Sequence, residues 1–350
     1  MRENFKIILL PFSALYGGIV AVRNAGYDSG FFKAKKLPRP VVSVGNISVG
    51  GSGKTPFVML LIEKLMAMGK KPAVLSRGYR RLTKELVIAC PEKGSDPDIQ
   101  MLGDEPALIS MNFPDVPVAV HADRHRAGEE VLEKFGADVF LLDDGLQNRE
   151  LHRDIDFVLM SRSLYDLRDS YLPAGNLRDS RGRMKQADVV VLTNHGTAAV
   201  ERDYEELLGK YSDAPVAGVN YVASDLTDHA GTHHPLELLR EKKVAAFCGI
   251  ARPEIFFENV SGLSRELISV RRFPDHHWYD EYDIDGVFEG EEDAIAVTTA
   301  KDAVRIFHDE ELMQLEDIGR IYSLNEKAVV EYGDEHIENA LTIAFGRVYA

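Results

Sequence analysis

The sequence has 350 residues, of which 45% are apolar, so the chain can bury a substantial core and is long enough for two domains. Its formal net charge of −15 argues against a general nucleic-acid binder, which normally carries a basic patch. The two cysteines, Cys90 and Cys248, lie far apart without a metal-binding spacing and are typical of a reduced cytosolic protein.

The amino-terminal stretch departs from this acidic average. Residues 5–22 are mostly apolar, and residues 1–39 carry seven basic minus two acidic side chains, a local charge of +5. The apolar run is shorter than the roughly 20 residues that a membrane-spanning helix needs. We expect a helix on the cytoplasmic membrane surface, with its apolar side in the lipid and its basic residues near anionic headgroups. A signal peptide and a helix that covers a domain core are the alternatives.

Residues 41–56, VVSVGNISVGGSGKTP, have the order of a P-loop. The β-branched run 41–44 predicts a buried parallel strand, a glycine-rich loop follows, and a helical pattern covers 57–68. In this arrangement backbone N–H groups surround phosphates, Lys54 reaches the β- and γ-phosphates, and the Thr55 hydroxyl binds Mg²⁺. Ser48 stands where the usual pattern has its first glycine, and a glycine-rich turn without a ligand is the alternative. The predicted nucleotide contacts are Asn46, Gly50, Gly51, Ser52, Gly53, Lys54, Thr55 and Pro56.

Two candidate segments follow the P-loop helix. A strand at 72–76 ends in the basic run Arg77 to Arg81, which is either a ligand-facing end of the sheet or a solvated turn. Strands are expected at 85–89 and 116–120, and between them Asp104 begins a helix that continues to Met111. If Asp104 is the N-cap of this helix, that structural role alone explains it.

A strand at 138–142 leads into Asp143 and Asp144. Carboxylates at a strand end after a P-loop are candidates to hold Mg²⁺, and a capped turn is the alternative. Strands are also expected at 155–160 and 189–193, with the loop LPAGNLRD at 172–179 between them.

The second region begins near Pro215. Strands are expected at 216–222, 244–249, 267–273 and 294–299, with helical patterns between them. His276, beside a carboxylate, is a candidate for acid/base work or for a hydrogen-bonded structural role. Lys301 lies near a helix start, where either a ligand phosphate or exposure to water would account for a cation.

These patterns predict an α/β protein in three parts. Residues 1–38 form the membrane-associating segment, and 39–214 a P-loop NTPase-type parallel sheet domain with helices on both faces. Residues 215–350 form a second, smaller α/β domain.

Taken together, the motifs resemble the tetraacyldisaccharide 4′-kinase family, the lipid A 4′-kinases of Gram-negative bacteria. The resemblance follows the chain in order and rests on GNISVGGSGKTP at 45–56, SRGY at 76–79, GDEP at 103–106, DDGLQ at 143–147, LPAGNLRD at 172–179, FCGIARPEIFF at 247–257, FPDHHWY at 273–279 and TAKDAV at 299–304. Ser48 is itself part of the family's pattern. The family commonly has Leu-Arg-Glu where this chain has Leu177-Arg178-Asp179, so the carboxylate is retained but is one methylene shorter.

The resemblance implies transfer of the ATP γ-phosphate to the 4′-hydroxyl of tetraacyldisaccharide 1-phosphate. Lys54 would hold phosphates, Thr55 with Asp143 or Asp144 would manage Mg²⁺, and Asp104 would be the base, paired with His276. Arg77, Tyr79 and Arg178 would line the substrate or phosphate side.

The implied partners are the lipid substrate and a membrane surface, with no nucleic acid and no obligate protein partner. The implied location is the cytoplasmic face of the bacterial inner membrane, as a peripheral, monotopic protein. Two other classes compete with the kinase: a P-loop ATPase or GTPase switch at the membrane, and a non-enzymatic adaptor that retains a nucleotide-binding fold.

Overall fold

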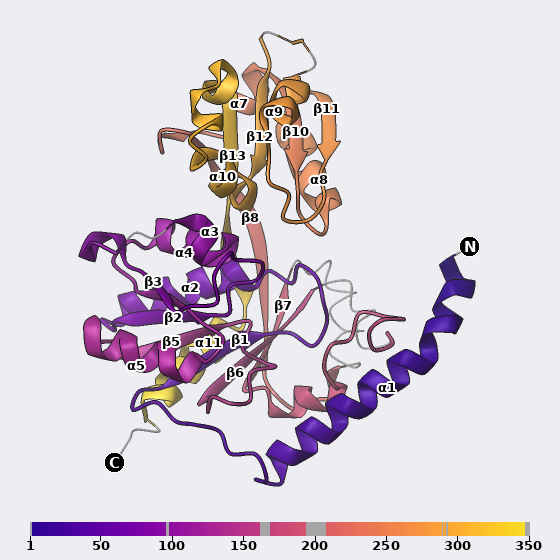
Figure 1. Ribbon diagram of the computed structural model, residues 1–350, viewed down its shortest axis with the longest axis vertical. Coiled ribbons are helices and arrows are strands. Elements are labelled where there is room, and N and C mark those ends of the chain that lie inside the picture. The colour runs from indigo at the N-terminus through magenta and orange to yellow at the C-terminus, as the bar shows by residue number, and fades with distance from the viewer. Residues whose placement is uncertain are drawn as a thin grey trace.

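The computed structural model describes residues 2–95, 98–161, 169–193, 208–288, 290–291 and 293–346. They form a larger and a smaller lobe, stacked along the long axis of the molecule. The amino-terminal helix α1 (Arg2–Asp28) lies along one side of the larger lobe (Figure 1).

The larger lobe is built on a mostly parallel sheet. Its central strand, β1 (Val41–Gly45), is buried along its whole length, as its β-branched sequence predicts, and pairs in parallel with a strand on each side. Each strand predicted in this lobe is present. In spatial order they are β3 (Val87–Ala89), β4 (Val118–Val120), β2 (Pro72–Ser76), β5 (Val139–Asp143), β1, β6 (Ile155–Ser161) and β7 (Val189–Thr193), and β3 runs antiparallel to β4.

Helices cover both faces of this sheet because alternate side chains of each strand point to opposite sides. Val42 and Val44 pack in a core with residues of α2 (Lys54–Ala67), α4 (Asp104–Asn112) and α11 (Asp334–Gly346). Val41 faces the other way and shares a core with α5 (Arg124–Lys134). The predicted P-loop NTPase-type layering is therefore confirmed. Shorter elements are η1 (Pro91–Lys93), α3 (Ile99–Leu102) and η3 (Arg181–Gln186).

Two long strands join the lobes. β8 (Val216–Asp228) pairs in parallel with β7 at its start and antiparallel with β13 (Ile321–Tyr332) along most of its length. The chain then returns to the larger lobe as α11, whose Ile337 and Leu341 lie in the core beside β1. Neither β13 nor α11 was predicted; their residues lie in the stretch 215–350 that was expected to form the smaller domain.

The smaller lobe repeats the α/β layering, as predicted. β10 (Lys243–Cys248) lies between β11 (Glu266–Arg272) and β12 (Ile295–Thr299), all parallel, and β12 pairs with β13. Separate apolar cores fill the two faces of these strands. The remaining elements are β9 (His233–His234), α7 (Leu238–Glu241), α8 (Pro253–Leu263), α9 (Glu281–Phe288), α10 (Ala300–Phe307), η4 (Leu312–Gln314) and η5 (Glu316–Arg320).

α1 is longer than the apolar run 5–22 predicts, and Pro11 and the pair Gly17-Gly18 do not end it. Packing supports it, because Ser13, Gly17, Val20 and Asn24 recur at helical spacing and are buried against the larger lobe. Between Lys6 and Asp28 the helix is long and apolar enough, by length and composition, to cross a membrane. Its exposed apolar side chains are Ile7, Ile8, Leu10, Phe12, Leu15, Ile19 and Val22.

Candidate active site

The P-loop holds its shape through bonds within the loop and from β8. Gly53, at φ +74°, precedes α2, and its carbonyl oxygen accepts a 2.7 Å hydrogen bond from the Tyr221 hydroxyl. A Cβ on Gly53 would lie 2.1 Å from the Tyr221 ring, so both backbone angle and space require glycine. Asn46 Nδ2 donates to Ser52 Oγ at 2.9 Å across the loop. The other predicted nucleotide contacts, Gly50, Gly51, Thr55 and Pro56, lie in this loop and the first turn of α2.

Lys54 points toward the end of β5, where Asp144 follows the strand. Lys54 Nζ lies 3.5 Å from Asp144 Oδ1 and 3.5 Å from Asn46 Oδ1. Arg178 reaches the same two groups: Nη1 donates to Asp144 Oδ2 at 2.8 Å, and Nη2 donates to Asp144 Oδ1 and to Asn46. Burial opposes ionisation of Asp144, but Lys54 and Arg178 outweigh it and lower the pKa of this carboxyl. Lys54 and Arg178, two of the residues predicted on the phosphate side, therefore meet at one carboxylate.

Asp143, the last residue of β5, is in the opposite electrostatic situation. Its side chain is buried, and neither carboxylate oxygen has a hydrogen-bond partner among the described residues. Burial, followed by the charges of Glu105 and Asp144, raises the pKa of Asp143 to about 7. A buried carboxylate without a partner is costly, and a cation would remove that cost.

The residues here fit Mg²⁺. Thr55 is buried at the start of α2 and offers a hydroxyl, while Asp143 and Asp144 offer carboxylates, the hard oxygen donors that this ion prefers. Within the described ranges, no group of three or more His, Cys, Asp or Glu side chains is arranged to hold a metal by itself. Mg²⁺ is usually held by one or two carboxylates together with substrate phosphates, so this pair suffices.

Asp104 is where the two lobes meet. The N-cap of α4 is Gly103 without a side-chain cap bond, so the capping interpretation of Asp104 was wrong. Its Oδ2 instead accepts from His276 Nδ1 at 2.8 Å and from Arg305 Nη1. The neighbouring His277 bonds Asp283 at 2.7 Å, which leaves His276 as the histidine that meets Asp104.

The charge balance at Asp104 favours the ionised carboxylate. Burial alone would raise its pKa, but the hydrogen bond from His276 and the charge of Arg305 outweigh burial and lower it. Arg305 in turn donates to Asp302, which accepts from the Tyr279 hydroxyl at 2.9 Å and from the Gly249 amide at 3.1 Å.

A second ion pair lies beside the first. Lys301, at the start of α10, donates to Glu105 of α4. The charge of Lys301 lowers the pKa of Glu105, and Glu105 raises that of Lys301 against the opposing effect of its burial. A ligand phosphate and exposure to water were the two predicted explanations for a cation at Lys301. The structure adds a third, because Lys301 pairs with a carboxylate from the other lobe.

Comparison with known proteins now bears on this site. A model of the family described as tetraacyldisaccharide-1-P 4′-kinase matches residues 5–344. The chain belongs to this family. The enzyme class predicted from the sequence, an ATP-dependent lipid kinase, is confirmed.

Individual relatives match most of the chain. The tetraacyldisaccharide 4′-kinase of Aquifex aeolicus is 38% identical over 323 residues, covering 92% of this chain and 94% of that protein. That of Syntrophus aciditrophicus is 36% identical over 322 residues, covering 87% of this chain and 85% of its own. A crystal structure of LpxK from Aquifex aeolicus in complex with ATP matches with a TM-score of 0.80 at 35% identity, over 97% of this chain and 99% of that one.

The basic loop after β2 lies beside the lobe junction. Arg77 and Tyr79 are exposed, and the Tyr79 ring lies 5.4 Å from that of His276. Arg80 Nη1 donates to the Asp275 carbonyl at 2.9 Å, so this loop contacts the smaller lobe. The kinase therefore presents the Tyr79 ring beside the histidine that bonds Asp104, and an exposed arginine, Arg77, in the same loop.

Sequence reasoning missed several residues of the site. Arg305 and Tyr221 do not belong to any motif identified in the sequence. Each contributes through a contact with a residue far away in the chain, which only the folded structure shows. Arg124, at the start of α5, is also buried, and burial followed by the charge of Arg77 lowers its pKa to about 10. Arg252, in the motif FCGIARPEIFF, lies against Gly50, where an added Cβ would be 3.3 Å from its Nη2 atom.

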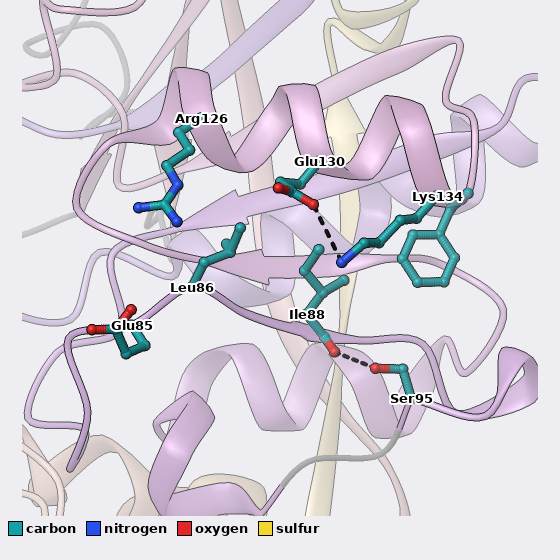
Figure 2. A pocket seen from close by; sticks show the side chains of 8 residues that line it. Glu85, Leu86, Ile88, Ser95, Arg126, Glu130 and Lys134 are labelled. Atoms are coloured by element: carbon teal, nitrogen blue, oxygen red, sulfur yellow. Dashed lines mark hydrogen bonds and ion pairs between the residues drawn. The ribbon is translucent and has the colours of Figure 1, made fainter.

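A separate pocket lies between α5 and the segment around β3 (Figure 2). An ion pair of 3.2 Å between Lys134 and Glu130 crosses its wall. None of its lining residues is a predicted site residue, so it contributes nothing to the catalytic assignment. The lining residues are Glu85, Leu86, Ile88, Ser95, Arg126, Glu130, Lys134 and Phe135.

Proposed function

We propose that this kinase transfers the γ-phosphate of ATP to the 4′-hydroxyl of tetraacyldisaccharide 1-phosphate, with Asp104 as the base. The observation that carries the proposal is the convergence of His276 and Arg305, both from the smaller lobe, on one oxygen of Asp104 in the larger lobe. Both bonds go to Oδ2, and none of the described residues bonds Oδ1, so this oxygen is available to an acceptor hydroxyl. A carboxylate kept ionised at neutral pH suits a base that acts on a weakly acidic hydroxyl as the new bond forms.

The 4′-oxygen bonds to the γ-phosphorus, the bond from that phosphorus to the β–γ bridging oxygen breaks, and the hydroxyl proton moves to Asp104. ADP leaves. The P-loop amides and Lys54 hold the phosphates, and phosphoryl transfer needs such positioning and charge neutralisation more than covalent catalysis.

Mg²⁺ supplies positive charge to the β- and γ-phosphate oxygens when it is bound. Thr55, Asp143 and Asp144 would hold it. The unpaired oxygens of buried Asp143 support this assignment, and Asp144, which already meets Lys54 and Arg178, fixes the orientation of those cations.

Three side chains of the larger lobe suit an acceptor that is both a sugar and a phosphate. Arg77 and Arg124 supply positive charge that a phosphate monoester recognises, and Tyr79 offers a ring on which a sugar face can pack. The exposure of Arg77 and Tyr79 supports a place at the mouth of the site rather than in the P-loop.

The exposed side of α1 favours a membrane surface as the second partner of this kinase. Exposed large apolar side chains gather on this helix, and exposed apolar surface of this kind marks a site of membrane or protein contact. The opposite stripe bonds to the larger lobe through Ser13 and Asn24, so that side of the helix is not available to lipid. A helix with one side on protein and the other exposed lies in the membrane interface instead of crossing it.

We propose that the kinase lies on the cytoplasmic face of the bacterial inner membrane as a peripheral, monotopic protein. ATP chemistry and the free thiols Cys90 and Cys248 suit the reduced cytosolic side. Access of an acylated acceptor to Asp104 needs no obligate protein partner in this arrangement.

The test is transfer of ³²P from γ-labelled ATP to tetraacyldisaccharide 1-phosphate in detergent micelles, with Lys54→Ala as the control. Labelled lipid from the wild type alone supports the proposal. Release of free phosphate without labelled lipid would overturn it and favour a nucleotide-driven switch. Equal labelling by Lys54→Ala would show that the P-loop does not carry the reaction.

A further inference from the structure

The loop from Asp169 to Arg181 lies between α1 and the P-loop and bonds to both. Toward α1, the Ala174 amide donates to Ser13 Oγ at 2.9 Å, and the Tyr16 hydroxyl donates to the Arg178 carbonyl at 3.2 Å. At Gly17 a Cβ would lie 2.7 Å from the Tyr171 ring, so helix and loop are in close contact.

Toward the P-loop, the same segment forms backbone hydrogen bonds. The Val49 amide donates to the Asn176 carbonyl at 2.8 Å, and the Ile47 carbonyl accepts from the amides of Arg178 at 2.9 Å and Asp179 at 3.1 Å. Residues 47–49 lie in the glycine-rich loop itself. The segment therefore acts as one backbone layer between the amino-terminal helix and the nucleotide site.

Asp179 is the most buried polar residue of this layer, with a relative exposure of 0%. Its Oδ1 accepts from Asn24 Nδ2 of α1 at 2.8 Å and from the Ser180 amide at 2.8 Å. Arg23, also of α1, lies 3.7 Å away at Oδ2. Burying a carboxylate is costly unless hydrogen bonds and charge compensate it, and α1 supplies most of the compensation.

Arg178, the adjacent residue, points the other way. Its guanidinium bonds Asp144 and Asn46, which are the two groups that Lys54 also approaches. Because Arg178 and Asp179 share one peptide unit, fixing the Asp179 side chain on α1 also fixes the backbone from which Arg178 reaches the site.

We propose that Asp179 is a positioning residue that ties α1 to Arg178, and through Arg178 to Asp144 and the P-loop. Its carboxylate bonds to α1 and does not serve as a metal ligand. The shorter aspartate, where the family commonly has glutamate, still reaches Asn24 in this chain. The inference goes beyond the proposed function, because it concerns the geometry of the nucleotide site whatever the acceptor.

A reciprocal exchange tests this link. Asn24→Asp places two carboxylates face to face, and Asp179→Asn removes the charge that Arg23 and Asn24 compensate. The double variant Asn24→Asp with Asp179→Asn restores one donor and one acceptor. Asn339→Asp, at an exposed position of α11, is the matched control for an Asn→Asp change on a helix.

For each variant, kcat and KM for Mg·ATP are measured in detergent micelles, the dissociation constant of Mg·ADP by calorimetry, and the melting temperature by circular dichroism. We expect kcat per folded enzyme to fall about tenfold or more in each single variant, and the double variant to recover most of the loss. The control should match the wild type. Asn24→Ala, a milder change, replaces any single variant that does not fold.

Three results would overturn the proposal. If the single variants melt lower but keep wild-type kcat, the contact is structural only. If Asp179→Asn needs more Mg²⁺ and the double variant does not recover, the carboxylate serves the metal. If neither the wild type nor any variant labels the lipid, the proposed function fails, but the Mg·ADP affinities still show whether Asn24 and Asp179 are coupled to the nucleotide site. Equal Mg·ADP affinities in all variants would then refute that coupling.

Discussion

Arg305 carries the contact between the lobes at the candidate base, and its replacement by methionine gives a measurable prediction. The side chain is 1% exposed and bridges Asp104 of the larger lobe to Asp302 of the smaller lobe. Arg305→Met keeps an apolar chain of similar length and leaves both carboxylates buried without their guanidinium. Breaking a buried ion pair from one side costs about 3–5 kcal/mol of unfolding free energy.

The assay is urea unfolding followed by tryptophan fluorescence. Trp278 is the chain's one tryptophan and lies two residues after His276, so it reports on the smaller lobe. With an m value of about 2 kcal/mol/M, the loss corresponds to a midpoint lower by about 1.5–2.5 M urea. Arg272→Met is the matched control, because the pair of Arg272 with Glu254 is 58% and 57% exposed and is worth about 0–1 kcal/mol.

The loss of unfolding free energy in Arg305→Met should also depend on pH. The wild-type pKa of Asp104 lies below its ordinary value of 3.8, so its stabilising contribution is present above that value and is lost as the pH falls through the folded-state pKa. Without Arg305, chiefly the hydrogen bond from His276 opposes the effect of burial on Asp104, so the ionised carboxylate is less stable and its protonation on acidification relieves part of the penalty. The stability gap between wild type and variant should therefore narrow from pH 8 to pH 5. A loss no larger than that of Arg272→Met, or a gap independent of pH, would refute this reasoning.

Three further predictions follow from the site and α1. Asp104→Asn should lower turnover by about 10²–10⁴-fold with ATP affinity unchanged, because the base acts in the transition state; near-wild-type turnover would exclude Asp104 as the base. Because burial holds the pKa of Asp143 at about 7, Mg²⁺ must displace a proton below that pH, so its affinity in the presence of ATP should fall by about tenfold per pH unit in acid. Calorimetry should find no such pH dependence of Mg²⁺ affinity in Asp143→Asn. The same dependence on pH in the wild type and the variant would exclude Asp143 as a Mg²⁺ ligand. Replacing the exposed Leu15 and Ile19 by serine should reduce sedimentation with anionic vesicles while leaving ATP binding intact, and unchanged partition would argue against α1 as the anchor.

The strands of the larger lobe and the P-loop could be predicted because their signals are local. A β-branched run, glycines and Lys54-Thr55 occupy consecutive positions, and each has its own conformational or chemical requirement. The same locality explains the misses. β13 is an uncommonly long strand in which partly buried and exposed residues alternate. α11 packs on a core that consists mainly of residues more than 150 positions earlier in the chain.

The candidate base shows the same limit within the site. Asp104 and His276 could be named from motifs, but a sequence does not show that Arg305 and His276 meet the same oxygen. The partner of Asp179 was also beyond prediction, since Asn24 lies 155 positions away in a helix whose buried stripe is defined only by what it packs on. Residue types indicated the chemistry, and long-range contacts determine which atoms take part.

The arrangement of the sheet explains how contacts from two lobes can be held at one site. Because β8 and β13 pair over most of their length and belong to both lobes, the smaller lobe is joined to the larger by hydrogen-bonded strands and not by an unstructured linker. The same strand, β8, supplies Tyr221 to the Gly53 carbonyl. The P-loop and the lobe that delivers His276 and Arg305 therefore share one structural element. A change in the pairing of β8 with β13 should therefore alter both the nucleotide loop and the contacts of the candidate base, Asp104.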